Sequence, residues 1–591
     1  MKKELIVTLA AAAIGTTCLS SINAEKAYAK TSGDYKYTVA DKSKKTCTID
    51  KYNGKKQNVT VPSKINGYKV TGIGKAAFKT NKKISKVSLP DTLTQIGEEA
   101  FSECGSLKEI NIPKKVTKIE KGTFSNCDQL KKVTLSSGVK TIGKDAFRDC
   151  FSLKEINIPK SVKTIGESAF GDCNNLKSIE LPKVKKIGED AFGRCYNLSN
   201  VTFSSDLRSI GDFAFFECKG LKKIEIPKSV KVIGGDAFFS CEKLKTVTLR
   251  EGVTKIGKRA FGGTKIETVY IPKTVKTIDD ISTVFPENLK SISVDKDNAV
   301  FDSRNDCNAI ISTKDNALLL GCSNTVIPDG VTSISEKAFY FRKDLKKIDL
   351  PDSVTAIGVS AFEGCSNLKE VRFSENLTTI SDSAFAFAPI TDLKLPDSLK
   401  SIDKFAFSST GIKDLKLPAG VEKIAPDAFN PDSLTNIKVD EKNTVFDSRN
   451  NCNAIIETAS NTLVLGCINT SIPDTVTAIG ADAFYQCKKL EQISLPDGIK
   501  AIGSHAFYGC ESLKEIKLPS NITAIEEGTF CECSALTKVS MSDNVTAIKE
   551  DAFSYCTKLS EFTWPKGLTQ VGENAFYACD KLTIPAGVKV K

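Results

Sequence analysis

The sequence has few of the residues from which active sites and metal centres are most often built. Its 591 residues include one histidine, one tryptophan and two methionines. A lone histidine, His505, cannot form a catalytic or metal-binding constellation by itself, and the cysteines form no C-x-x-C pairs of the kind that hold zinc. No Walker loop, G-x-S-x-G elbow or H-E-x-x-H motif occurs. We therefore expect no catalytic activity, no cofactor and no metal site.

Long apolar runs are confined to the N-terminus. Lys2 and Lys3 precede an apolar stretch at residues 5–14, and Ala27-Tyr28-Ala29 has the small-x-small pattern of a cleavage site. These features predict a signal peptide at residues 1–29 and an exported mature chain, secreted or held at the cell surface. No later stretch reaches the ~20 apolar residues of a membrane-spanning helix, so we expect no transmembrane segment.

The charge shows no strong bias toward one sign along the chain. Lysine and arginine number 83 and aspartate and glutamate 71, a formal charge of +12, and both signs are spread through the sequence. Nucleic-acid binding requires a basic stripe, commonly with aromatic side chains between the charges. The sequence therefore predicts no nucleic-acid partner. It gives no indication of an oligomeric state.

The dominant feature that is present is a repeat with a period of 23 residues, roughly I-G-x-x-A-F-x-x-C-x-x-L-x-x-I-x-L-P-x-x-V. A fixed period of about 20 to 30 residues is typical of a solenoid, in which each coil buries its apolar face only against its neighbours. The repeat phenylalanines fall in three runs: Phe78, Phe101, Phe124, Phe147, Phe170, Phe192, Phe215, Phe238 and Phe261; Phe339, Phe362, Phe385, Phe407 and Phe429; Phe484, Phe507, Phe530, Phe553 and Phe576.

One coil can be followed in residues 101–124. Ile110 and Ile112 alternate with polar residues, which predicts a half-buried strand, and Pro113 ends it. Ile119 belongs to a second short extended segment. The A-F-x-x-C-x-x-L stretch is expected to close the coil as a turn with 3₁₀ or short helical character. Stacked in register about 4.8 Å apart, such coils predict a curved rod over residues 71–591 with one continuous spine of phenylalanine rings.

The cysteines follow the same period. Thirteen of them lie three residues after a repeat phenylalanine, for example Cys104 after Phe101. Recurrence once per coil favours small, buried, free thiols over the disulfide framework that an exported, cysteine-rich chain usually has. Cys531 stands outside this pattern, at a position expected on the surface.

Three regions depart from the repeat. Residues 30–70 contain strand-like pieces between turns and are expected to form an N-terminal β-rich cap. Inserts near 295–325 and 440–470 are copies of each other, with F-D-S-R-N followed by C-N-A-I-I, and each predicts a hairpin. Folding each hairpin about its polar turn places two pairs of cysteines opposite each other, as disulfides or as paired free thiols: Cys307 with Cys322, and Cys452 with Cys467.

Two surfaces are candidates for binding. Polar side chains of mixed charge point outward from successive strands and suit either protein contacts or simple solvation; a sugar-binding platform would also need exposed aromatic rings, and Tyr270 is nearly the only one on this face. The candidate strand-face residues are Glu109, Asn111, Lys132, Thr134, Glu155, Asn157, Lys223, Glu225 and Tyr270. The candidate residues of the insert loops are Phe301, Asp302, Arg304, Phe446, Asp447 and Arg449.

The repeat resembles that of the BspA-like leucine-rich repeat family of bacterial surface proteins, over about residues 45–585. The I-G-x-x-A-F core, the period, the strand-rich cap and the F-D-S-R-N hairpin all fit. The resemblance implies a right-handed solenoid that mediates adhesion to host matrix proteins or to other microbes, with no catalytic residues. Two alternatives stay open: a secreted structural or decoy scaffold without a specific ligand, and a glycan-binding module.

Overall fold

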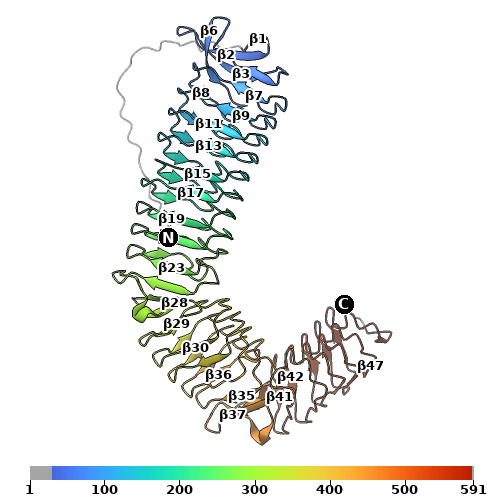
Figure 1. The fold of residues 1–591 in the computed structure, drawn as a ribbon. Coiled ribbons are helices and arrows are strands. Elements are labelled where there is room, and N and C mark those ends of the chain that lie inside the picture. Colours follow the sequence, from blue (N-terminus) through green and yellow to red (C-terminus); the bar gives the residue numbers. More distant parts are fainter. Residues whose placement is uncertain (1–28, 589–591) are drawn as a thin grey trace, which may run out of the picture.

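A computed structural model describes residues 29–588 of the protein. All but the last residue of the predicted signal peptide therefore lie outside the described residues. The chain winds into a long rod of stacked coils (Figure 1). The rod runs from β1 to about β23, bends near β28, and bends again between β37 and β41. It is a solenoid of parallel strands, as the period predicted.

Most coils contribute two strands, one to each of two faces. The first-face strands alternate exposed, buried, exposed, because their central residue is an apolar side chain of the repeat. They are β4 (Asn58–Thr60), β7 (Lys86–Ser88), β9 (Glu109–Asn111), β11 (Lys132–Thr134), β13 (Glu155–Asn157), β15 (Ser178–Glu180), β17 (Asn200–Thr202), β19 (Lys223–Ile226), β21 (Thr246–Leu249), β23 (Thr268–Ile271), β25 (Ser291–Val294), β30 (Lys347–Asp349), β32 (Glu370–Arg372), β35 (Asp414–Leu417), β37 (Asn436–Val439), β43 (Glu515–Lys517), β45 (Lys538–Ser540) and β47 (Glu561–Phe562).

The second-face strands are mostly two residues long and end on the repeat isoleucine. Most pair in parallel with the equivalent strand of a neighbouring coil, as Ile119 pairs with Ile142. They are β8 (Gln95–Ile96), β10 (Lys118–Ile119), β12 (Thr141–Ile142), β14 (Thr164–Ile165), β16 (Lys186–Ile187), β18 (Ser209–Ile210), β20 (Val232–Ile233), β22 (Lys255–Ile256), β24 (Thr277–Ile278), β29 (Ser333–Ile334), β31 (Ala356–Ile357), β33 (Thr379–Ile380), β34 (Ser401–Ile402), β36 (Lys423–Ile424), β41 (Ala478–Ile479), β42 (Ala501–Ile502), β44 (Ala524–Ile525), β46 (Ala547–Ile548) and β48 (Gln570–Val571).

Hydrogen-bonded turns close each coil on a third side, which we call the turn face. In the coil of Phe101, Glu99 and Glu103 have φ values of 55° and 59°, the left-handed region. The backbone N–H groups of Glu99, Phe101 and Glu103 donate to carbonyl oxygens of the next coil at 2.8 to 2.9 Å. The turn backbone thus satisfies its polar groups between coils, as a strand does. Within residues 29–588, 3₁₀ helix occurs only in the two inserts.

The phenylalanine rings stack in three separate spines. Ring centroids of successive coils lie 4.8 Å apart for Phe78 and Phe101 and 5.8 Å apart for Phe261 and Phe285. Stacking then stops, begins again at Phe339, and is interrupted a second time before Phe484. The prediction of one continuous spine was therefore wrong.

The inserts cause both interruptions. In the first, β26 (Phe301–Asp302), β27 (Ala309–Ser312) and β28 (Ala317–Gly321) form an antiparallel meander, and β28 pairs in parallel with β29. Gly321 then lies under the ring of Phe339, where an added Cβ would be 2.1 Å from the ring. The second insert repeats this with β38 (Phe446–Asp447), β39 (Ile455–Glu457) and β40 (Thr462–Leu465). A glycine thus takes the place of a stacking ring below Phe339 and Phe484.

Each insert reproduces the topology of the N-terminal cap. The cap consists of β1 (Lys30–Ser32), β2 (Tyr35–Asp41), β3 (Thr46–Tyr52), β5 (Lys64–Ile65) and β6 (Tyr68–Ile73), with β1, β2 and β3 antiparallel and β3 parallel to β6. Tyr52, Gly321 and Gly466 donate the same backbone hydrogen bond to Ala77, Ala338 and Ala483, at 2.8, 2.8 and 2.9 Å. The solenoid therefore starts three times. We call residues 30–300, 301–445 and 446–588 its first, second and third segments.

Candidate functional site

The first-face strands carry charges that compensate one another from coil to coil. Lys132 lies in register between Glu109 and Glu155, and its ammonium pairs with Glu155 at 3.1 Å. Lys86 pairs with Glu109 at 3.3 Å in the same way. Such exposed pairs contribute at most about 1 kcal/mol each. The face is therefore polar and locally neutral, without a field of one sign to attract a charged partner.

The other predicted residues of this face are exposed, and several of them hydrogen-bond to neighbouring coils. Asn157 exchanges two hydrogen bonds of 2.8 Å with the backbone of Leu135. Glu225 pairs with Arg250, and the hydroxyl of Tyr270 donates to Asp295. Asn111, Thr134 and Lys223 also point outward from β9, β11 and β19. None of these arrangements brings together a catalytic set.

The F-D-S-R-N residues of the inserts hold the inserts in place. Phe301 and Phe446 are buried, with 7% and 4% exposure, so their rings cannot meet a partner. Arg304 donates two hydrogen bonds to Asp302 and one to Asn316, and Arg449 does the same with Asp447 and Asn461.

The electrostatics of the two Asp–Arg pairs agree with this structural role. Burial raises the pKa of Asp302, but the hydrogen bonds from Arg304 outweigh it and the net pKa is lowered. Asp447 has a lowered pKa for the same reason, with Arg449 as its partner. Both carboxylates therefore stay ionised, as members of an ion pair, at neutral pH.

Two side chains of each insert also terminate the preceding coil. Ser303 accepts a 2.8 Å hydrogen bond from the N–H of Val294, at the edge of β25. Asn298 donates to the carbonyls of Pro272 and Val275 and accepts from the N–H groups of Val300 and Phe301. At this edge, the side chains of Ser303 and Asn298 thus bond backbone groups of the preceding coils, which no further strand of the sheet covers. Asn443 and Ser448 repeat them in the second insert.

The four cysteines of the inserts are free thiols, so of the two alternatives left open by the sequence the structure contains no disulfides at these positions. A bulge between Ile310 and Ile311 shifts the register, and Ala309 lies opposite Gly321. Cys307 consequently packs in the core of the second segment, and Cys322 in that of the first. Cys452 and Cys467 are separated in the same way, between the third and second segments.

The remaining cysteines of residues 29–588 are also free and buried. The thiol of Cys127 donates to the carbonyl oxygen of Phe101 at 3.1 Å, a bond to the preceding coil that recurs along each segment. Burial raises the pKa of Cys104 and of Cys365 to about 12. Cys531, expected on the surface, is buried as well. With the exception of Cys579, whose pKa is lowered by a hydrogen bond from Cys556, these thiols are core groups that stay protonated at neutral pH.

Aromatic side chains are exposed on the turn face, which sequence reasoning had overlooked. Phe387 is 58% exposed, Phe405 43%, Tyr555 49% and Tyr577 56%. All four occupy variable positions within two residues of a repeat phenylalanine. Because the spine needs only one ring per coil, a second aromatic residue in that stretch was the signal that could have identified them.

A cleft opens on this face where the second and third segments meet. It encloses about 210 Å³, and Phe405, Asn430, Tyr485 and Gln486 are among its lining residues. Asp427 also lines it, with a buried Oδ1 that has no hydrogen-bond partner and a pKa raised by burial. The cleft therefore combines aromatic rings with an unsatisfied acceptor.

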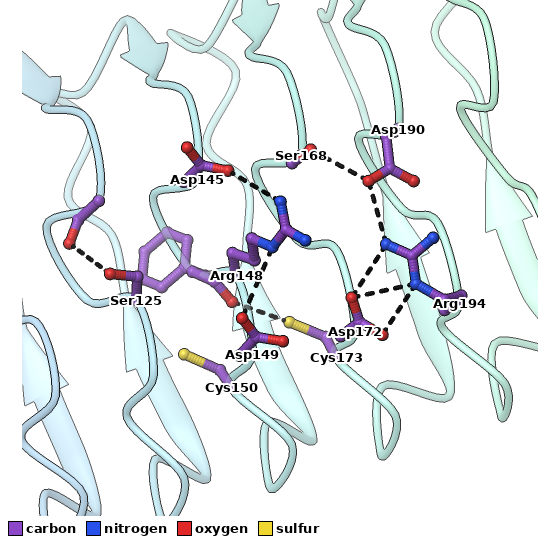
Figure 2. A network of polar contacts seen from close by, with 12 residues as sticks. Ser125, Asp145, Arg148, Asp149, Cys150, Ser168, Asp172, Cys173, Asp190 and Arg194 are labelled. Atoms are coloured by element: carbon purple, nitrogen blue, oxygen red, sulfur yellow. Dashed lines mark hydrogen bonds and ion pairs between the residues drawn. The ribbon is translucent and has the colours of Figure 1, made fainter.

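The turn face of the first segment carries a network of ion pairs instead. Figure 2 shows Arg148 between Asp145 and Asp149, and Arg194 between Asp172 and Asp190. Arg194 approaches Asp172 at 3.0 Å, and hydrogen bonding to that carboxylate raises the pKa of the guanidinium. Burial, together with the charge of Asp172, raises the pKa of Asp149. Each arginine is shared between two carboxylates; Arg148 pairs within its own coil, whereas Arg194 joins its coil to the preceding one through Asp172.

The described residues contain neither a metal-binding cluster nor a membrane-spanning helix. Between Ala29 and Val588, no group of three or more His, Cys, Asp or Glu side chains is arranged to hold a metal ion. No helix in this part of the chain has the length and apolar character needed to cross a membrane.

Comparison with known families identifies the repeat. Residues 52–177, 163–290, 324–455 and 465–583 match the family described as BspA type leucine rich repeat region (6 copies). The chain belongs to this family. The resemblance seen in the I-G-x-x-A-F core is thereby confirmed over most of the sequence. No curated protein matches the chain.

Several solved structures of leucine-rich repeat proteins are similar. A leucine rich cell surface protein from Faecalibacterium prausnitzii is 24% identical, with 87% of this chain and 94% of that one covered and a TM-score of 0.32. A leucine-rich repeat protein from Bacteroides ovatus is 20% identical, with 94% and 93% covered and a TM-score of 0.36. The pneumococcal vaccine antigen PcpA is 16% identical, with 93% and 99% covered and a TM-score of 0.31.

Proposed function

We propose that this protein is an exported, non-catalytic binding protein that acts at or beyond the cell surface, and that its partner is another protein of a host matrix or of a microbial surface. The observation that supports this proposal best is the set of exposed rings on the turn face near the second bend. Phe387 and Phe405 contribute nothing to the spine, and exposing them to water is unfavourable.

Aromatic side chains of this kind are the usual anchors of protein interfaces. Phenylalanine and tyrosine are enriched in interface cores, and charged residues are depleted there. The strand face predicted from the sequence has the opposite character, since its charges are already paired between coils. We therefore place the main contact on the turn face, and the strand face is a second surface to test.

A second candidate function rests on the cleft beside these rings. A volume of about 210 Å³ suits a single small ring. Asp427, Asn430 and Gln486 could bond neutral hydroxyl groups, while an aromatic ring stacks on the C–H face of a sugar. Glycan binding, which the strand face disfavoured, is therefore favoured at this cleft.

The test is a binding assay with the mature chain, residues 30–591, against host matrix proteins, whole bacteria and a glycan array. F387S combined with F405S should abolish saturable protein binding. F151S is the matched control, because Phe151 is 41% exposed on the first segment, far from the second bend. Binding to sugars alone would favour the glycan reading. Absence of saturable binding to all three would leave a structural or decoy scaffold.

A further inference from the structure

The second face of the first segment carries charge of almost one sign. In its eight-stranded sheet, β10 to β24, the six residues before the last residue of each strand include 16 lysines or arginines and two acids, Asp206 and Glu251. The same positions of the ten equivalent strands in the second and third segments include four basic and eight acidic residues. The positive charge of the chain is therefore concentrated on this face, although both signs are mixed along the sequence.

Five of these cations form a column along the rod. Lys140, Lys163, Lys185, Arg208 and Lys231 occupy the same position in five successive coils, immediately before β12, β14, β16, β18 and β20. The backbone N–H of each of the last four donates to the carbonyl oxygen of the cation before it, at 2.8 to 2.9 Å. At about 4.8 Å per coil, the column spans about 19 Å.

The charges of the column are not neutralised by neighbouring side chains. No carboxylate of residues 29–588 forms an ion pair with any of the five, four of which are exposed and one, Lys163, half-buried. The acid beside them, Asp206, is already paired with Lys183 at 3.1 Å. A hydrogen bond from Lys183, together with the charges of Lys185 and Lys163, lowers the pKa of Asp206. Like charges held side by side repel one another, so a bound anion would relieve this repulsion.

A hollow of about 420 Å³ lies beside the middle of the column. Lys185, Arg208 and Lys231 line it together with the hydroxyl groups of Ser205 and Ser229. The hydroxyl of Ser229 is buried and has no hydrogen-bond partner. The hollow thus combines three cations with hydroxyl groups, one of which is unsatisfied.

Hydroxyl side chains also stand next to the cations outside the hollow. Thr141, Thr164 and Ser209 directly follow Lys140, Lys163 and Arg208 in the sequence and are half-buried. A sulfated polysaccharide has the complementary composition, since its extended chain carries both sulfate groups and hydroxyl groups.

Other polyanions fit this face less well. Single-stranded nucleic acid is bound by aromatic side chains that stack on its bases, and the basic positions of this sheet include no aromatic residue. A peripheral membrane site needs exposed apolar side chains that enter the lipid. Between β10 and β24, Val232 is the large apolar residue that this face exposes, at 38%.

We infer that the column of Lys140, Lys163, Lys185, Arg208 and Lys231 binds a sulfated polysaccharide, such as a glycosaminoglycan of a host matrix. The polysaccharide lies along the rod, so that successive sulfates meet cations of successive coils. Release of its counterions adds to the attraction. The inference goes beyond the proposed function and does not rest on it, because it concerns another face and an anionic ligand.

The experiment measures the binding of heparin oligosaccharides of increasing length to the full mature chain by titration calorimetry. We expect saturable binding that strengthens until the oligosaccharide spans the column. The logarithm of the association constant should fall linearly with the logarithm of the salt concentration. Heparin from which the sulfates have been removed keeps the sugar chain and should bind at least about tenfold more weakly.

Two variants of equal charge test the position of the site. The first neutralises four cations of the column: K163Q, K185Q, R208Q and K231Q. It should weaken heparin binding about tenfold or more and leave thermal unfolding unchanged, because these side chains have no ion-pair partners. The matched control removes four exposed lysines of the first face in the same segment: K108Q, K131Q, K154Q and K177Q. Its heparin binding should stay within about twofold, since charges on another face are screened beyond about 8 Å in physiological salt.

Equal losses in the two variants would overturn the inference, because net charge alone would then account for binding. So would the absence of saturable binding to heparin. Binding of duplex DNA, polyglutamate or phosphatidylserine vesicles as tightly as heparin would also overturn it. F387S combined with F405S should leave heparin binding unchanged, so loss of all protein binding with heparin binding retained would refute the proposed function alone.

Discussion

The guanidinium of Arg342 donates a 2.5 Å hydrogen bond to the carbonyl oxygen of Pro286, 56 residues earlier in the chain. It donates a second, at 3.0 Å, to Gly321. Arg342 occupies the position that cysteine holds in most coils, three residues after the repeat phenylalanine, and only 2% of it is exposed. A buried cation thus joins the first segment to the second where the ring stack is interrupted.

Replacing this arginine should weaken the first junction. R342A leaves two buried carbonyl groups without donors and opens a cavity, so we expect a loss of about 2–4 kcal/mol. Hydrogen exchange should show the loss around Gly321 and Phe339 first. K343A is the control, because Lys343 is 60% exposed and weakly paired, and its effect should stay within about 0.5 kcal/mol. Equal losses in the two variants would contradict the assigned role.

Replacing the buried amide of Asn298 with a carboxylate should destabilise the protein. N298D removes the donors to Pro272 and Val275, at 2.9 and 3.1 Å, and places an oxygen beside two carbonyls. We expect a loss of about 3 kcal/mol at neutral pH. This environment raises the pKa of the new carboxyl above the ~3.9 of an unfolded aspartate. The loss in free energy of unfolding caused by N298D should therefore be largest at pH values above the raised pKa, where the carboxyl is charged. It should shrink as the pH falls below that pKa and the carboxyl becomes neutral.

Denaturant titrations of N298D at pH 4 and pH 8 would measure this difference. N443D should behave alike, because Asn443 makes the same bonds in the second insert. N436D, at an exposed position of β37, is the control and should change little at either pH. A penalty that does not depend on pH would contradict the account of the buried amide.

Gly321 should be irreplaceable even by alanine. A Cβ there would lie 2.1 Å from the ring of Phe339, and the ring is held by the stack above it. We expect G321A to lower the free energy of unfolding by about 1–3 kcal/mol. At Gly105 the nearest atom to an added Cβ is 3.6 Å away, so G105A should be close to neutral. Thermal unfolding of both variants provides the comparison.

The thiols should be unreactive in the folded protein and free after unfolding. Burial raises the pKa of Cys104 and Cys365 to about 12, so both remain protonated at pH 8. Cys579 is the exception among them, since a hydrogen bond from Cys556 lowers its pKa, and it should be alkylated first. Mass spectrometry of the unreduced, unfolded chain should find all thiols of residues 29–588 alkylated. A shortfall of two or four at the insert cysteines would restore the disulfide hypothesis.

Local features of the fold were predictable because the repeat fixes them within one or two coils. The alternation around Ile110 and the proline at 113 predict β9 and its end, and the period predicts that equivalent residues stack. The cysteine ladder follows from the same spacing. The insert hairpins could be located from sequence, but their register could not, since the bulge at Ile310 depends on packing against two cores.

The candidate sites were less predictable. Exposed polar residues such as Glu109 and Lys132 could be identified from the alternation of polar and apolar residues. The ion pairs that these residues form could not, because each pair joins side chains of two different coils. The cleft beside Phe405 is lined by residues of both the second and the third segment, which no single repeat predicts.

The sequence by itself determined that this protein is a solenoid with a stacked apolar interior, because a period of 23 residues leaves each coil only its neighbours to pack against. Only the tertiary structure decided that the solenoid starts three times. Each restart depends on long-range contacts, those of Arg342 with Pro286 and of Lys489 with Asp432, which join residues more than two coils apart. Those contacts join each segment to the next, and no pattern within one coil predicts them.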